Sequence, residues 1–84
     1  MNKVLKFSAT WCTPCLQMSK QIERLQEQLT NVSFVNIDID ASPEMISLHK
    51  VRSVPTLVKL DSDNIEIGRF SGSMIDAKLL EFLV

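Results

Sequence analysis

"SATWCTPCLQM", residues 8–18, places Cys12 and Cys15 three positions apart, between a predicted strand and a predicted helix. A pair with this spacing can form a structural disulfide, help to hold a metal ion, or exchange electrons with another disulfide. Each use requires different residues elsewhere in the chain. The rest of the sequence therefore indicates both the role of the pair and the fold that carries it.

The segments on either side of the cysteines predict a strand, a helix and a second strand. Residues 2–8 alternate, with Leu5 and Phe7 on one face. After Pro14, apolar residues recur at helical spacing, and this pattern predicts an amphipathic helix of about four turns. The recurring positions are Cys15, Met18, Ile22, Leu25 and Leu29. Residues 32–39 are β-branched and aromatic on both faces, which predicts a parallel strand buried on two sides.

The next segments predict a short helix and a β-hairpin. Ser42 suits a helix cap and Pro43 the first helical position, and we expect the helix to end near Lys50. Pro55 opens a strand, where its missing N–H is tolerated, and the turn residues 61–64 lead into an antiparallel partner strand.

A closing helix completes the expected fold. From Ser73 onward, apolar residues again recur at helical spacing, at Ile75, Leu79, Leu80, Phe82 and Leu83. The element order is therefore βαβαββα, within one α/β domain spanning residues 1–84.

Composition excludes several classes of function. The 84 residues are 45% hydrophobic, and nine basic side chains balance ten acidic ones without a basic cluster, so we expect no nucleic-acid partner. No apolar run approaches the ~18 residues of a membrane span, so we expect no membrane partner. Cys12 follows Lys3 too closely for a secretory leader, which predicts a cytoplasmic protein whose ordinary thiols stay reduced.

The cysteine spacing weakens two of the three uses. A disulfide that closes so short a loop stabilises the fold by only about 2 kcal/mol in the chain-entropy model. Zinc normally takes four ligands, and the chain offers Cys12, Cys15 and the single His49, so we expect no metal. A zinc site would need a carboxylate or a second chain to complete it.

Electron exchange fits the helix start. Cys12 lies just before the predicted helix, where free N–H groups and the helix dipole favour a thiolate, the attacking species in disulfide exchange. Cys15 shares the apolar stripe of the helix and should face inward, as a resolving thiol does. Pro14 starts the helix and fixes the spacing of the two sulfurs.

Trp11-Cys12-Thr13-Pro14-Cys15 after a strand, with Val54-Pro55-Thr56 before the hairpin and Gly72 before the last helix, resembles thioredoxin. The resemblance covers nearly all of the chain. It implies a thioredoxin fold with a four-stranded mixed sheet and three helices. It also implies that Cys12 is the exposed nucleophile and Cys15 the buried resolving cysteine, with no cofactor beyond the disulfide.

The same resemblance implies a surface that binds substrate. Trp11 would lie beside the cysteines, and Val54-Pro55 would be a cis peptide whose backbone holds an extended substrate. Gly72 would let a partner approach closely, although a turn before a helix explains it equally well. Met74 is a further candidate for the substrate groove.

The sequence also departs from the family pattern. It starts at the strand before the cysteines, whereas full-length thioredoxins begin with a further strand and helix, so we expect a glutaredoxin-sized core. Thr13 stands where glycine is usual. Lys6 aligns with the family's buried acid, and Asn36 with the lysine that accompanies it.

Lys6 has two interpretations. Its stem can lie along the sheet while its ammonium reaches water or pairs with Asp38. Alternatively, its charge lies near Cys15, favours the thiolate and makes the protein more oxidising.

The resemblance implies a monomeric thiol-disulfide oxidoreductase that reduces protein disulfides. Its electron donor would be a thioredoxin reductase, because the chain has no nucleotide-binding signature. Two alternatives stay open. The protein could be a glutaredoxin-like reductase recharged by glutathione, or a binding module that uses the groove without redox turnover.

Overall fold

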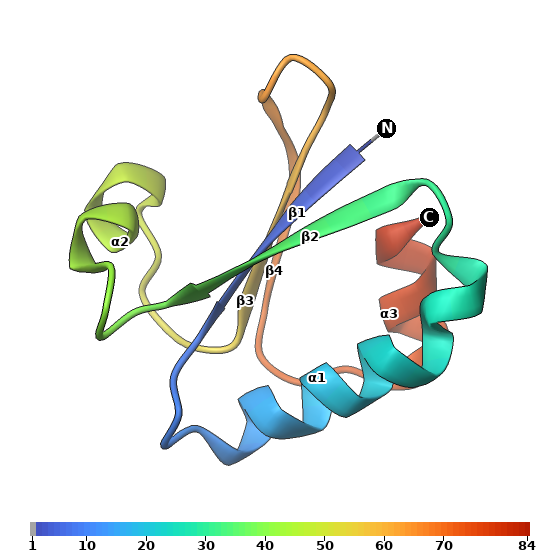
Figure 1. Cartoon of the computed structure of the whole chain (residues 1–84), viewed down its shortest axis with the longest axis horizontal. Coiled ribbons are helices and arrows are strands. Elements are labelled where there is room, and N and C mark those ends of the chain that lie inside the picture. The colour runs from blue at the N-terminus through green and yellow to red at the C-terminus, as the bar shows by residue number, and fades with distance from the viewer. Residues whose placement is uncertain (1) are drawn as a thin grey trace.

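A computed structural model describes residues 2–84, which form one sheet with helices on both of its faces (Figure 1). The elements follow the predicted order: β1 (Asn2–Ser8), α1 (Thr13–Leu25), the 3-10 turn η1 (Gln26–Gln28), β2 (Val32–Asp38), α2 (Pro43–His49), β3 (Thr56–Leu60), β4 (Glu66–Ser71) and α3 (Asp76–Leu83). The strands lie in the order β2-β1-β3-β4. Only the β1–β2 pair among them is parallel, so the predicted mixed sheet is confirmed.

Strand β1 is central, and its alternating side chains enter two separate cores. Val4 faces α1 and α3, where it packs with the apolar stripes of both helices. Leu5 and Phe7 face the opposite side, where they pack beneath α2. Figure 1 shows α1 and α3 covering one face of the sheet and α2 the other. The predicted alternation of β1 is confirmed, and the strand ends at Ser8, shortly before Cys12.

Strand β2 corrects one expectation. It pairs in parallel with β1, as predicted, but it is an edge strand and is not buried on two sides. Val35 is 40% exposed and Asn36 is also exposed, whereas Ile37 is buried. Because no neighbour within residues 2–84 covers the outer edge of β2, a β-branched pattern on both faces does not here indicate a central strand.

The closing helix begins later than predicted. Helix α3 starts at Asp76, and Ile75 before it keeps an extended backbone and an exposed side chain. Leu79 and Leu83 alone supply its fully buried stripe. At α2, Ser42 occupies the cap position as expected, but its side chain makes no capping hydrogen bond.

Polar contacts fasten α3 to α1. Gln21 Nε2 donates to Asp76 Oδ1 at 2.8 Å and to the Met74 carbonyl at 2.8 Å. Arg24 Nη2 donates to both carboxylate oxygens of Asp76, at 3.0 and 3.1 Å. The hydrogen bond from Gln21, together with Arg24, lowers the pKa of Asp76 below its usual range.

Asp76 should make the fold more sensitive to acid. Because its pKa is lowered on folding, its contribution is present above the unfolded-state pKa and is lost as the pH falls through the folded-state value. We expect Asp76→Asn to lower the melting temperature by a few degrees at neutral pH, with the difference closing in strong acid. Thermal melts over a pH series test this, with Glu81→Gln on the same helix as control. An equal difference at every pH would contradict the assignment.

Candidate functional site

Cys12 and Cys15 lie at the start of α1 and are joined by a disulfide, with their Cα atoms 5.2 Å apart. Cys12 is the N-cap residue, with an extended backbone, and Pro14 occupies the first turn as predicted. The Cys15 N–H donates to Cys12 Sγ at 3.2 Å. The sulfur therefore takes the place of the oxygen that usually caps a helix, in a position that favours a thiolate once the disulfide is reduced.

The burial of Cys12 corrects a second expectation. Cys12 is 5% exposed and Cys15 is 2% exposed, so neither cysteine is open to solvent in the disulfide form. Both pack against Ala9, with Ile39 and Val54 adjoining. Sequence alone does not show that the Cys12 side chain packs into this cluster. The exposed residues are those that flank it, Trp11 and Thr13.

Trp11 is 66% exposed, and its indole makes a hydrogen bond to the turn after β2. Its indole Nε1 donates to Asp40 Oδ2 at 3.0 Å. The Asp40 backbone N–H in turn donates to Asp38 Oδ1 at 2.9 Å. Sequence reasoning missed Asp40, and the available signal was an acid in the turn directly after β2, the strand paired in parallel with β1.

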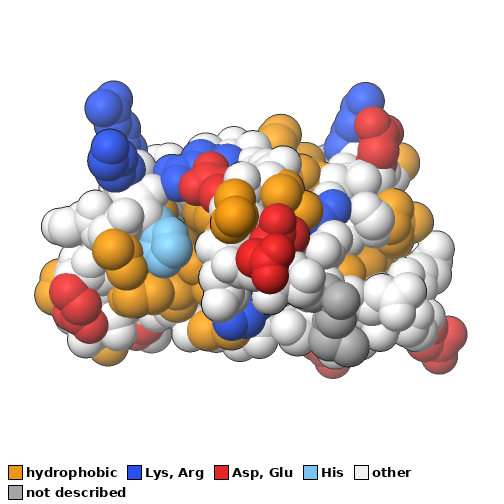
Figure 2. Space-filling model, turned by 90° about the horizontal axis from the view of Figure 1, so that it is seen from above, with side chains coloured by type: hydrophobic (Ala, Val, Ile, Leu, Met, Phe, Trp, Pro, Cys, Tyr) orange, Lys and Arg blue, Asp and Glu red, His pale blue; other side chains and the backbone are white. Residues whose placement is uncertain are grey.

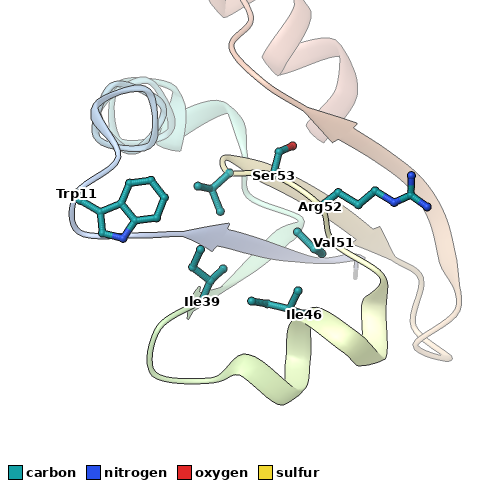
Figure 3. A pocket seen from close by; sticks show the side chains of 7 residues that line it. Trp11, Ile39, Ile46, Val51, Arg52 and Ser53 are labelled. Atoms are coloured by element: carbon teal, nitrogen blue, oxygen red, sulfur yellow. The ribbon is translucent and has the colours of Figure 1, made fainter.

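An apolar hollow lies beside the cysteines. It has a volume of about 310 Å³ and is lined by Trp11, Ile39, Ile46, Val51, Arg52, Ser53 and Val54. Figure 3 shows Trp11 at one end of the hollow and Arg52 at the other, with Ile39 and Ile46 between them. The Val54-Pro55 peptide is cis, as the resemblance implies, and Pro55 is buried. The structure thus brings Trp11 and Val54 into one surface.

Gly72 and Met74 occupy different positions. Gly72 has a φ of +94°, and its N–H donates to the Pro55 carbonyl at 2.9 Å, so it adjoins the cis peptide. A Cβ at this position would meet no atom within 4 Å, so the positive φ is what requires glycine. Met74 lines a separate hollow with Pro14 on the α1 side. The structure therefore does not bring Met74 to the Trp11 hollow.

Lys6 is not a simple surface lysine. Its side chain is buried, at 8% exposed, and Lys6 Nζ donates to Ser19 Oγ on α1. The expected alternative pairing with Asp38 does not form, because Asp38 lies opposite Ser8 in the sheet and its carboxylate accepts the Asp40 N–H. Burial lowers the pKa of Lys6 below its usual value.

The described surface outside the cysteine site shows no cluster of metal-binding side chains. Within residues 2–84, no group of three His, Cys, Asp or Glu side chains is arranged to hold a metal ion. His49 packs edge-on against Phe7, with ring centroids 5.8 Å apart. Figure 2 shows acidic and basic side chains interspersed on one face, with hydrophobic side chains beside the histidine. None of the helices described has the length and hydropathy to cross a bilayer.

A mixed sheet that carries a C-x-x-C disulfide at the start of its first helix, with a cis-proline loop packed beside it, defines the class of thioredoxin-fold proteins. Comparison with solved structures agrees. Fasciola hepatica thioredoxin superposes with a TM-score of 0.86 at 33% identity, covering 98% of this chain and 77% of that one.

Sequence comparison gives the family. The family model for thioredoxin matches residues 1–84. Thioredoxin H5 of Oryza sativa subsp. japonica is 38% identical over 69 residues, which are 82% of this chain and 50% of that protein. Thioredoxin C-3 of Corynebacterium nephridii is 35% identical over 75 residues, which are 89% and 51% of the two. The chain belongs to the thioredoxin family and spans about half the length of these two relatives.

Proposed function

We propose that the protein is a thiol-disulfide oxidoreductase that reduces disulfides in protein substrates. The single observation that carries this proposal is the Cys12–Cys15 disulfide at the N-terminus of α1, where the Cys15 N–H donates to Cys12 Sγ. A short-loop disulfide adds little stability, whereas this position favours the thiolate that exchange requires. Family membership supports the same chemistry.

The reaction proceeds through two exchanges. In the reduced protein, the Cys12 thiolate attacks one sulfur of a substrate disulfide, forms a mixed disulfide and releases the other substrate sulfur as a thiolate. Cys15, after losing its proton, attacks Cys12 and releases the second substrate thiolate. The substrate has then gained two electrons, and the Cys12–Cys15 pair is oxidised. Each exchange step converts one thiolate and one disulfide into another thiolate and another disulfide, so electrons balance and the reaction needs no bound cofactor.

The substrate would lie in the hollow between Trp11 and Val54. In this proposal the Val54 backbone holds an extended segment by strand-like hydrogen bonds, and Trp11 supplies an apolar contact held in place by Asp40. Gly72 borders the Pro55 loop without a side chain that would obstruct the segment. Thr13 and Pro14 form the exposed rim above the cysteines. Met74, which lines the same hollow as Pro14, would contact the substrate from the α1 side.

Turnover requires an electron donor. We propose a thioredoxin reductase as that donor and a reducing compartment, the cytoplasm, as the place of action, with a monomer as the working form. Glutathione is the rival donor. The sequence Trp-Cys-Thr-Pro-Cys favours the reductase, since the resemblance on which this proposal rests is to thioredoxin.

Insulin reduction tests the proposal. We expect precipitation of the insulin B chain to be faster with thioredoxin reductase and NADPH than with glutathione, glutathione reductase and NADPH at the same protein concentration. Faster reduction with glutathione would favour the glutaredoxin-like alternative. No reduction with either donor, in a protein whose two thiols titrate normally, would favour a binding module.

A further inference from the structure

Lys6 is a buried charge that the exchange steps above do not use. Among residues 2–84 the buried polar or charged side chains are Lys6 and Thr56, and only Lys6 can carry a charge. The two ion pairs in this part of the chain, Arg24–Asp76 and Arg69–Glu66, do not include it. A buried cation without a carboxylate is costly, so its position calls for a physical explanation.

A short chain of hydrogen bonds connects Lys6 with the second cysteine. Lys6 Nζ donates to Ser19 Oγ, and the Ser19 hydroxyl donates its one proton to the Cys15 carbonyl at 3.1 Å. Ser19 lies one helical turn after Cys15, so this second bond is the usual back-bond of a helical serine. A single hydroxyl therefore separates the ammonium from the backbone of Cys15.

The surrounding cavities agree with this connection. One hollow of about 230 Å³ is lined by Lys6 and Ser19 together with Glu23 and Asn36. A second, of about 160 Å³, is lined by Cys15 and again by Ser19. Ser19 thus stands between the amine and the cysteine.

Two carboxylates face the same region. Glu23 lines the hollow of Lys6 but is exposed, and Asp38 lines the hollow of Cys15 while accepting the Asp40 N–H. Neither carboxylate forms an ion pair with Lys6. The positive charge of Lys6 is therefore not neutralised by direct contact with a carboxylate.

Building on the proposed exchange function, we propose that Lys6, held by Ser19, is a positioning residue that makes the Cys12–Cys15 disulfide more oxidising. Reduction adds two electrons to a neutral disulfide and gives a thiol and a thiolate, with one proton taken up. A nearby cation stabilises the anionic reduced pair and leaves the neutral oxidised pair unaffected. Burial also keeps this attraction from being fully screened by water.

The proposal predicts a shift in the redox equilibrium of Lys6→Met, which removes the charge while keeping an unbranched stem. An opposite charge at about 4–6 Å moves a pKa by about 1–3 units, and the intervening hydroxyl places Lys6 at the low end of that effect. We expect the equilibrium constant for reduction by glutathione to fall about tenfold, or about 30 mV toward a more reducing potential. The pKa for the first deprotonation of the reduced Cys12–Cys15 pair should rise by about one unit.

The measurement is the fraction of oxidised protein in glutathione buffers at neutral pH, together with thiolate absorbance over a pH series. Lys3→Met is the matched control, because it removes the same charge from the same strand at a partly exposed position, and it should leave both values unchanged. Ser19→Ala keeps the charge but removes its anchor, and we expect part of the Lys6→Met shift.

The outcomes separate this inference from the proposed function. A wild-type pair that does not equilibrate with glutathione would overturn the exchange function itself. A normal wild-type equilibrium with an unchanged or more oxidising potential in Lys6→Met would overturn only the role of Lys6. An equal shift in Lys3→Met would show that the net charge of the protein, and not the position of Lys6, sets the reduction potential.

Discussion

Replacing Cys15 with serine is expected to abolish insulin reduction while leaving the first exchange intact. Cys12 would still lie at the N-cap of α1, where its thiolate is favoured, so it could still attack a substrate disulfide. The introduced hydroxyl could not attack the resulting bond, because an alcohol at neutral pH is a poor nucleophile without a neighbouring base. Turnover should fall to the uncatalysed background, and a mixed disulfide should accumulate.

Non-reducing gel electrophoresis and intact-mass measurement detect that species. Cys12→Ser is the matched control, with the same atomic change at the other sulfur, and we expect neither turnover nor a mixed disulfide. Accumulation in Cys12→Ser but not in Cys15→Ser would reverse the two assigned roles. Turnover by either variant at the wild-type rate would contradict the two-cysteine mechanism.

Phe7→Ala is expected to cause the largest loss of stability. Phe7 is 0% exposed, lies on the central strand β1, and packs in the cluster beneath α2. Truncating a buried phenylalanine usually costs about 3–5 kcal/mol. The whole free energy of unfolding of a small domain is about 5–15 kcal/mol, so the variant should be largely unfolded on mild heating or in dilute denaturant.

Urea titration measures this loss. Phe7→Leu keeps much of the volume and should lose less than about 1.5 kcal/mol, so it gives a foldable comparison if Phe7→Ala does not fold. Leu48→Ala removes an apolar side chain that is 70% exposed, and its effect should stay within about 0.5 kcal/mol. Equal losses for Phe7→Ala and Leu48→Ala would contradict the placement of Phe7 in the core.

Much of the fold could be predicted because local patterns and tertiary packing agree. The stripe from Cys15 to Leu29 is buried as expected, although the helix ends at Leu25 and a 3-10 turn carries the chain on to Leu29. Strand β2 was predicted less well. Its residue types describe a pleated apolar strand, but they do not say how many neighbours the strand has.

The site shows the same division. Cys12 and Cys15 could be predicted from the spacing of their motif, and the cis Val54-Pro55 peptide from the resemblance to thioredoxin. Asp40 and Ser19 could not, because their hydrogen bonds to Trp11 and Lys6 depend on tertiary contacts between residues far apart in the sequence. The burial of Cys12 depends on its packing against Ala9, Ile39 and Val54, which lie in three different segments of the chain.

The central place of β1 has a consequence for how the chain folds. The first strand in sequence pairs with β2 and also with β3, so Lys3 lies opposite Leu60. During synthesis the pairing of β1 with β3 therefore has to wait until β3 has left the ribosome. Contacts between such distant residues slow folding, because the loop between them must be closed first. We expect the β3–β4 hairpin and α1 to form early, and the docking of β3 onto β1 to limit the rate.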